Sequence, residues 1–164
     1  MALADFIPSD GQRRIADAIT DAERHTTGEI CVHVTPRCRG NVVKRATRTF
    51  NRLHLYTTKR RNAVLIFVAY EDRKFAILGD TAINEAVPEG YWDGEVEELG
   101  RFLTAGRPVD GICEVVGRIG ESLSQYFPGE RDDENELSNE VTFDDGFDDE
   151  VPEDHNDDDY GNME

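Results

Sequence analysis

Hydrophobic positions along the first third of the chain change from helical spacing to strand spacing and back. Apolar residues recur every three or four positions from about Pro8 to His25, which predicts a helix, and Ser9 with Gln12 has the spacing of a capping box at its start. Residues 29–34 carry alternating β-branched side chains, which is typical of a strand. Residues 41–53 place apolar side chains on one face and arginines on the other, which predicts a surface helix.

The middle of the chain predicts a hairpin of two strands. Residues 63–70 are apolar or aromatic throughout, as in a central strand covered on both faces, and residues 75–78 return after the polar turn 71–74. Asp80 is then placed to cap a short helix. The remaining helices are expected at 81–87, at the segment containing Trp92 to Leu103, and at the segment containing Ile112 to Tyr126.

This order of elements predicts an α/β fold, a three-layer α/β/α sandwich with a small mixed sheet. We expect the first two strands to be parallel, joined by a helical crossover, and the third strand to run antiparallel to the second. Glu29 and Asn62 then begin the parallel strands, and Asp80 follows the antiparallel one. These three polar residues are therefore predicted to meet at one edge of the sheet.

Charge divides the chain into two parts. The formal net charge is -17, and residues 129–164 contain 17 acidic residues and one basic residue. We predict a domain at residues 1–140 and an acidic tail at residues 141–164. The tail has too few apolar side chains to offset the entropy lost on ordering, so we expect it to be disordered.

Basic residues concentrate in one part of the predicted domain. Nine of the 18 Lys and Arg residues lie between Arg37 and Arg61. This segment is interpreted either as a solvated helix face with a loop or as a surface that binds anions. In a further hypothesis, the acidic tail folds back on the segment and competes with other anions. We do not expect a nucleic-acid partner.

The chemistry of the predicted sheet edge favours a hard metal ion. Glu29, Asp80 and Asn62 offer only oxygen ligands, which suit calcium or magnesium better than zinc or copper. The acidic residues 132–136 could add ligands if that segment packs against the edge. The alternative interpretation is that Asp80 is only a helix cap and Glu29 a solvated strand end.

Other function classes lack their sequence motifs. The chain contains no GxSxG, Walker, GxGxxG or HExxH motif, and its three cysteines have no CxxC spacing. It has no apolar run of the roughly 18 residues that a membrane span needs, and no signal peptide is recognisable at its start. We therefore expect a monomeric cytoplasmic protein with no membrane association.

Four segments of the chain share a pattern with one known family: residues 22–30, 58–66, 75–80 and the region from Phe127-Pro128 through Asp133 to Asn135-Glu136-Leu137. Together they resemble the TPM domain family. The resemblance spans about Phe6 to Asn139, and the family includes thylakoid-lumen acid phosphatases, photosystem II repair proteins and many bacterial proteins of unknown role. Unlike secreted members, this chain resembles a cytoplasmic, bacterial-type member.

The family resemblance implies an α/β/α sandwich and a divalent-metal site, with calcium in some relatives. It makes Arg61 and Asn62 candidate contacts for a substrate or anion, with Arg61 either orienting a phosphate or neutralising the carboxylates. The implied metal ligands are Glu29, Asp80, Asp132 and Asp133.

We therefore expect a calcium-binding or magnesium-binding interaction module whose protein partner is unknown. One alternative is a metal-dependent acid phosphatase that acts on phosphomonoesters; because no nucleophile is identifiable, it would use metal-activated water. The other alternative is a basic surface that binds anions and is masked by the acidic tail.

Overall fold

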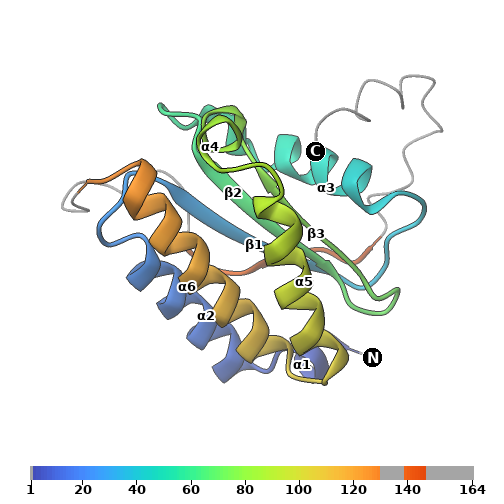
Figure 1. Cartoon of the computed structure of the whole chain (residues 1–164). Coiled ribbons are helices and arrows are strands. Elements are labelled where there is room, and N and C mark those ends of the chain that lie inside the picture. Colours follow the sequence, from blue (N-terminus) through green and yellow to red (C-terminus); the bar gives the residue numbers. More distant parts are fainter. Residues whose placement is uncertain (1, 130–138, 147–164) are drawn as a thin grey trace.

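The computed structural model describes residues 2–129 and 139–146 of the chain, and these form helices around one sheet (Figure 1). The helices are α1 (Leu3–Phe6), α2 (Ser9–Ala22), α3 (Val42–Arg52), the 3-10 helix η1 (Leu55–Thr57), α4 (Thr81–Ala86), α5 (Tyr91–Thr104) and α6 (Pro108–Tyr126). The strands are β1 (Glu29–Thr35), β2 (Ala63–Ala69), β3 (Lys74–Gly79) and β4 (Thr142–Phe143).

The sheet is mixed, with the strand order β3-β2-β1-β4. β1 and β2 are parallel, with Glu29 opposite Ala63, and β3 runs antiparallel to β2. These pairings confirm the predicted connectivity of the three longer strands. The short β4 lies parallel to β1 on its other side, where Thr142 is opposite His33.

Two helical layers cover the sheet and confirm the predicted α/β/α sandwich. α2, α5 and α6 cover one face, and Figure 1 shows α2 and α6 side by side along it. α3 and η1 cover the other face. The strand residues toward the first layer include Ile30, Val32, Val34, Val64, Ile66 and Val68, whereas those toward the second include Cys31, Ala63, Leu65 and Phe67.

The start of α2 differs from the prediction. Ser9 is the first residue of the helix, and Pro8 occupies the N-cap position without a side-chain cap. Gln12 does not return to the cap residue, because its side-chain amide donates to the carbonyl of Ile7 at 3.1 Å. The predicted capping box is therefore wrong.

The expectation of disorder from residue 141 is wrong for residues 141–146. Val141 is buried in the first core layer, and the next two residues form β4. The Asp144 amide then donates to the carbonyl of Val34 at 3.2 Å. The composition argument fails here because it counts apolar side chains and takes no account of the buried residues His33 and Arg45, which bind Asp144. The rest of the predicted tail, residues 147–164, lies outside the described residues, and the division at residue 140 stays a prediction.

Candidate functional site

Glu29, Asn62 and Asp80 lie at one edge of the sheet, as the topology predicts. Glu29 is paired with Ala63, and the Asp80 amide donates to the Ala63 carbonyl at 2.9 Å. Asn62 directly precedes that shared neighbour. All three side chains are buried, and Glu29 has an exposed fraction of 0 %. The interpretation of Glu29 as a solvated strand end is therefore wrong.

Asp80 uses both carboxylate oxygens within the domain. Oδ1 accepts from the Thr81 amide at 2.7 Å and from Nη2 of Arg61 at 2.8 Å, and Oδ2 accepts from Nε of Arg61 at 2.7 Å. Asp80 is thus the N-cap of α4, as predicted. The two-point contact with Arg61 is the geometry in which a guanidinium holds a carboxylate most strongly. Arg61 therefore neutralises Asp80 in this structure.

Asn62 leaves one polar atom without a hydrogen-bond partner. Its side-chain nitrogen donates to Oγ1 of Thr27 at 3.1 Å, which turns the amide toward the segment before β1. Its Oδ1 is buried and accepts no hydrogen bond from the described residues, and Oγ1 of the buried Thr58 is in the same situation. A buried polar atom without a partner costs about 1–3 kcal/mol, so Oδ1 favours a donor or a cation.

A further buried carboxylate, Glu23, lies at the start of β1. Its Oε2 accepts the Ile30 amide at 2.7 Å, and the residue is 2 % exposed. Sequence reasoning placed Glu23 in the family resemblance and gave it no role. The sheet edge therefore has one buried carboxylate, that of Glu23, beyond the predicted Glu29 and Asp80.

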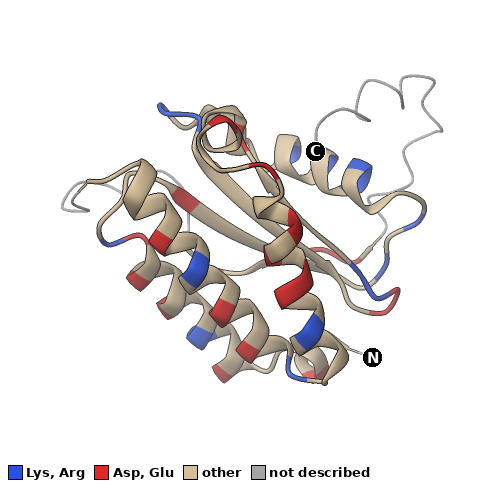
Figure 2. Ribbon diagram, viewed as in Figure 1, with Lys and Arg blue, Asp and Glu red and all other residues tan. Residues whose placement is uncertain are grey.

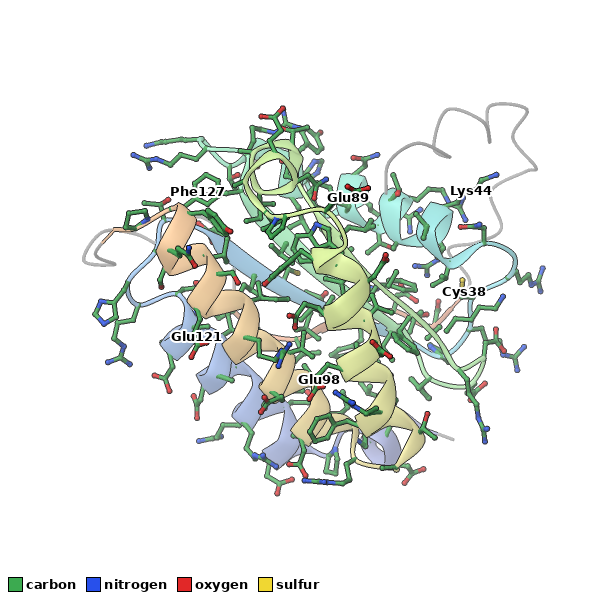
Figure 3. The ribbon with its side chains drawn as sticks, in the orientation of Figure 1. Cys38, Lys44, Glu89, Glu98, Glu121 and Phe127 are labelled. Atoms are coloured by element: carbon green, nitrogen blue, oxygen red, sulfur yellow. The ribbon has the colours of Figure 1, made fainter. Side chains whose placement is uncertain are left out.

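The end of α6 lies against this edge. Thr26 forms a β-bridge with Pro128, and its hydroxyl donates to the Leu123 carbonyl at 3.0 Å. Gly129 donates its amide to the His25 carbonyl at 3.1 Å. Figure 3 labels Phe127 at this end of the molecule. The chain therefore leaves α6 beside the start of β1.

The remaining predicted ligands, Asp132 and Asp133, lie outside the described residues. Within residues 2–129 and 139–146, no group of three or more His, Cys, Asp or Glu side chains is arranged to hold a metal ion. The described part of the edge thus offers polar atoms from Glu29 and Asn62 but does not by itself complete a set of metal ligands.

A second polar cluster, which the sequence analysis did not predict, lies under α3. Oδ2 of Asp144 accepts from Nε2 of His33 at 2.7 Å and from Nη2 of Arg45 at 3.1 Å. Oδ1 accepts from the hydroxyl of Thr35 and from the Gly146 amide. This Asp144 cluster joins the segment after β4 to both β1 and α3.

The environment of Asp144 favours its charged form. Burial by itself raises the pKa of a carboxyl group, but the hydrogen bonds from His33, Thr35 and the Gly146 amide, together with the charge of Arg45, outweigh it. The pKa of Asp144 is therefore held well below its ordinary value. Asp144 remains ionised at neutral pH, inside a largely buried cluster.

Arg45 corrects the predicted exposure of the arginines on α3. Its side chain is 1 % exposed, its guanidinium lies 5.0 Å from the centre of the Phe67 ring, and Nη1 donates to Thr49 at 2.7 Å. Helical spacing could have indicated this burial, because Arg45 lies on the same face of the helix as Val42 and Thr49. The carboxylate of the distant Asp144 offsets part of the cost of burying that charge.

A family model described as the TPM domain matches residues 1–122. The chain belongs to the TPM domain family. It is similar to the BA42 protein of the psychrophilic bacterium Bizionia argentinensis, with 35% sequence identity and a TM-score of 0.80. That similarity covers 87% of this chain and 99% of BA42.

A more distant structure supports the fold of this TPM domain. The N-terminal domain of the cg2496 protein from Corynebacterium glutamicum has 17% identity and a TM-score of 0.57, over 71% of this chain and 73% of that one. Among curated proteins, none is significantly similar to this chain. None of the described helices is both long enough and apolar enough to cross a membrane.

The family match covers some of the candidate residues of this TPM domain and not others. Glu29, Arg61, Asn62 and Asp80 lie within the matched residues. The match ends at residue 122, so Pro128, which pairs with Thr26, and Asp144, which binds His33 and Arg45, lie beyond it.

Proposed function

We propose that this TPM domain binds a calcium or magnesium ion at the sheet edge formed by Glu29 and Asn62. The observation that supports the proposal is the buried Oδ1 of Asn62, which has no hydrogen-bond partner among the described residues. It lies at the start of β2, next to the residue paired with the buried Glu29. Carboxylate and amide oxygens are preferred ligands of both ions.

The acidic segment after α6 is the proposed source of the remaining ligands. Gly129 is hydrogen-bonded to His25 beside this edge. Three residues span at most about 11 Å and four residues about 14 Å, so Asp132 and Asp133 are both within chain reach of this edge. A metal ion held in this way would attach residues beyond Gly129 to the domain, which is how the ion would organise an interaction surface for a protein partner.

Asp80 stays a candidate ligand in this proposal, with a specific requirement. Because Arg61 and the Thr81 amide use its oxygens, Asp80 would have to exchange the Arg61 contact for the metal. The exchange would release a guanidinium whose side chain is already 47% exposed. Metal binding and the availability of Arg61 for an anion would then be coupled.

The test is a calcium titration of the chelator-treated full chain, followed by backbone amide NMR and by thermal unfolding. We expect saturable shifts at residues 25–29 and at Asn62, and a rise in the unfolding temperature, because a ligand of the folded state stabilises it. Glu29→Gln should abolish both effects. Glu89→Gln, a matched change at an exposed position, should leave both unchanged.

Three results would contradict the metal proposal. One is the absence of saturable shifts at the sheet edge in the unmodified chain with either calcium or magnesium, a result that does not depend on how any variant folds. Another is an undiminished calcium response in Glu29→Gln. Shifts confined to residues after Gly146 would also contradict it, since they would place cation binding in the acidic tail.

A second candidate function is an anion-binding surface on α3 that the acidic tail masks. The contact between Asp144 and Arg45 supports it, because it attaches the start of the acidic tail to the basic helix. Figure 2 shows Lys and Arg positions along α3. A chain ending at Gly146 keeps the Asp144 contact and should bind polyphosphate more tightly than the full chain, with a steep salt dependence. Equal affinity of the two chains would dismiss the masking mechanism.

Phosphomonoester hydrolysis is a further proposal at the same edge, and the half-exposed Arg61 favours it. A bound metal ion would supply an activated water, and Arg61 would orient the phosphate. We expect turnover of p-nitrophenyl phosphate to be lost with chelator and in Glu29→Gln. Turnover that survives both treatments would indicate a contaminating enzyme.

A further inference from the structure

A pocket of about 730 Å³ lies at the opposite end of the sheet from Glu29 and Asn62. It is formed by α1, the end of β2, the start of β3 and the connection between α5 and α6. Figure 3 labels Cys38 toward this end and Phe127 at the other. The carboxyl ends of the parallel strands β1 and β2 lie here, which is where open α/β sheets commonly bind ligands.

One wall of the pocket is aromatic. The rings of Phe6 and Tyr70 stack with their centres 4.9 Å apart and an angle of 17° between their planes. Phe75 from β3 and Leu103 from α5 add apolar surface. Tyr70 directly follows β2, and its amide donates to the carbonyl of Thr35 at 2.9 Å, so the ring is carried by a fixed part of the sheet.

The charge of the pocket is opposite to that of the protein. Four basic side chains line it against two acidic ones, although the whole chain carries a net charge of -17. A local excess of positive charge in a concave site attracts anions. The basic residues are Arg14, Arg73, Lys74 and Arg107, and the acidic ones are Asp5 and Asp110.

Existing contacts determine which of these cations is available. Asp110 accepts from Arg14 at 3.0 Å and from Arg107 at 3.1 Å, so one carboxylate holds two guanidiniums at the pocket. Lys74 donates to the carbonyls of Cys38 and Gly40. Arg73, at the turn between β2 and β3, has no hydrogen bond or ion pair with any residue of the described ranges.

We propose that this pocket binds a flat aromatic anion, an aromatic ring system that bears a phosphate or carboxylate group. The ring packs against Phe6 and Tyr70, and the anionic group is paired with Arg73 and with the guanidiniums held by Asp110. The volume lies within the range of roughly 300–1,000 Å³ that is typical of small-molecule sites. The proposed metal site at the other edge of the sheet is not involved, so one proposal can fail without affecting the other.

Tyr70 contributes a hydrogen-bond donor to this site. Burial, with the nearby charges of Glu71 and Asp5, raises the pKa of Tyr70 above its ordinary value. The phenol therefore keeps its proton at neutral pH and can donate to an anionic ligand.

The test is an amide NMR titration of the full chain in the presence of chelator, which removes any contribution from the metal edge. The probes are adenosine monophosphate, 1-naphthoate, adenosine and inorganic phosphate. We expect saturable shifts around residues 68–75 and 103–110 with at least one aromatic anion. Adenosine monophosphate tests the phosphate form of the ligand and 1-naphthoate the carboxylate form. Adenosine and inorganic phosphate should each bind at least about tenfold more weakly than the aromatic anion.

Two substitutions test separately how the charge of Arg73 and the ring of Tyr70 contribute to binding. Arg73→Asn should weaken binding about tenfold, and asparagine tolerates the left-handed backbone at this position, where φ is 56°. Tyr70→Leu should weaken it by a similar factor. Arg60→Asn makes the same charge change at an exposed position near the start of β2, at the other end of the sheet, and should have no effect.

Three results would overturn the pocket proposal. The first is no saturable shift with either aromatic anion up to about 10 mM. The second is binding of adenosine as tight as that of adenosine monophosphate. The third is unchanged affinity in both Arg73→Asn and Tyr70→Leu, with Arg60→Asn as the reference.

Discussion

The carboxylate of Asp144 accepts a hydrogen bond of 2.7 Å from His33, a residue 111 positions earlier in the chain. The same oxygen is 3.1 Å from the guanidinium of Arg45, on the helix that covers this face of the sheet. β4 adds only two residues to the sheet, so backbone pairing alone gives it little stability. The Asp144 cluster, together with the buried Val141, therefore holds the segment after residue 139 on β1.

Asp144→Asn should destabilise the domain by roughly 2–4 kcal/mol, because it removes the negative charge that the buried side chains of Arg45 and His33 contact. Urea unfolding at neutral pH measures the change. Asp145→Asn is the matched control at a neighbouring acidic residue and should change stability by less than about 1 kcal/mol. Equal losses in the two variants would show that general tail charge, and not the buried contact, provides the stability.

The lowered pKa of Asp144 predicts that its contribution to the unfolding free energy depends on pH. The pKa of Asp144 is lowered in the folded protein, so its contribution is complete above its ordinary pKa of about 3.9 and is lost as pH falls toward the folded value. The difference in unfolding free energy between the unmodified chain and Asp144→Asn should therefore be constant near neutral pH and shrink below about pH 5. A difference that persists unchanged to about pH 2 would contradict this role of the carboxylate.

Shortening the chain tests β4 independently. A chain ending at Gly146 loses nine acidic residues but keeps the Asp144 cluster, and its stability should stay within about 1 kcal/mol of the full chain. A chain ending at Ser138 also loses β4 and should be at least as unstable as Asp144→Asn. Urea unfolding of the two chains distinguishes these outcomes, and similar stability of both would mean that β4 contributes nothing.

Asp80 combines a helix cap with an ion pair, and two substitutions separate them. Asp80→Asn keeps a good capping residue and loses the charge, so we expect a loss of about 1 kcal/mol or less, since Arg61 is half exposed. Asp80→Ala loses both interactions and should cost about 2 kcal/mol. Thermal unfolding in chelator measures both, with Glu85→Ala on the same helix as a control. Equal costs for the two Asp80 variants would argue against a capping contribution.

Close packing of α2 against α6 depends on Gly120. A Cβ atom there would lie 2.6 Å from the Cβ of Ala22 and 3.0 Å from its backbone, so Gly120→Ala should destabilise the domain by about 1–3 kcal/mol. Gly117 lies on the same helix with nothing near its Cβ position, and Gly117→Ala should stabilise by up to about 1 kcal/mol. Opposite signs in urea unfolding are expected, and a stabilising Gly120→Ala would contradict the close approach.

Much of the fold could be predicted from local pattern. β2 is apolar at every position because helices cover both of its faces, and the predicted strand at 63–70 differs from β2 by one residue. The predicted cap Asp80 is correct, since capping depends on residues adjacent in sequence. The capping box at Ser9 is wrong because Pro8 occupies the N-cap position and Gln12 has another acceptor nearby. Short-range signals thus fail where a competing partner is close by.

The candidate site was predictable only in part. Chain connectivity was enough to bring Glu29, Asn62 and Asp80 to one edge, because parallel strands begin at the same edge and a hairpin returns there. It did not show that Arg61 occupies both oxygens of Asp80. Arg61 makes that contact from a backbone in the left-handed region, with a φ of 52°.

The sequence by itself determined the helices α2 to α6, the three longer strands and the edge where their polar ends meet, because these follow from periodicity and from the order of elements along the chain. Only the tertiary structure decided which charges are buried. Arg45 and Asp144 lie 99 residues apart, and neither has a local signal that identifies the other. Burial of a charge is favourable only when a partner arrives with it, so it is settled by packing and not by the pattern around either residue.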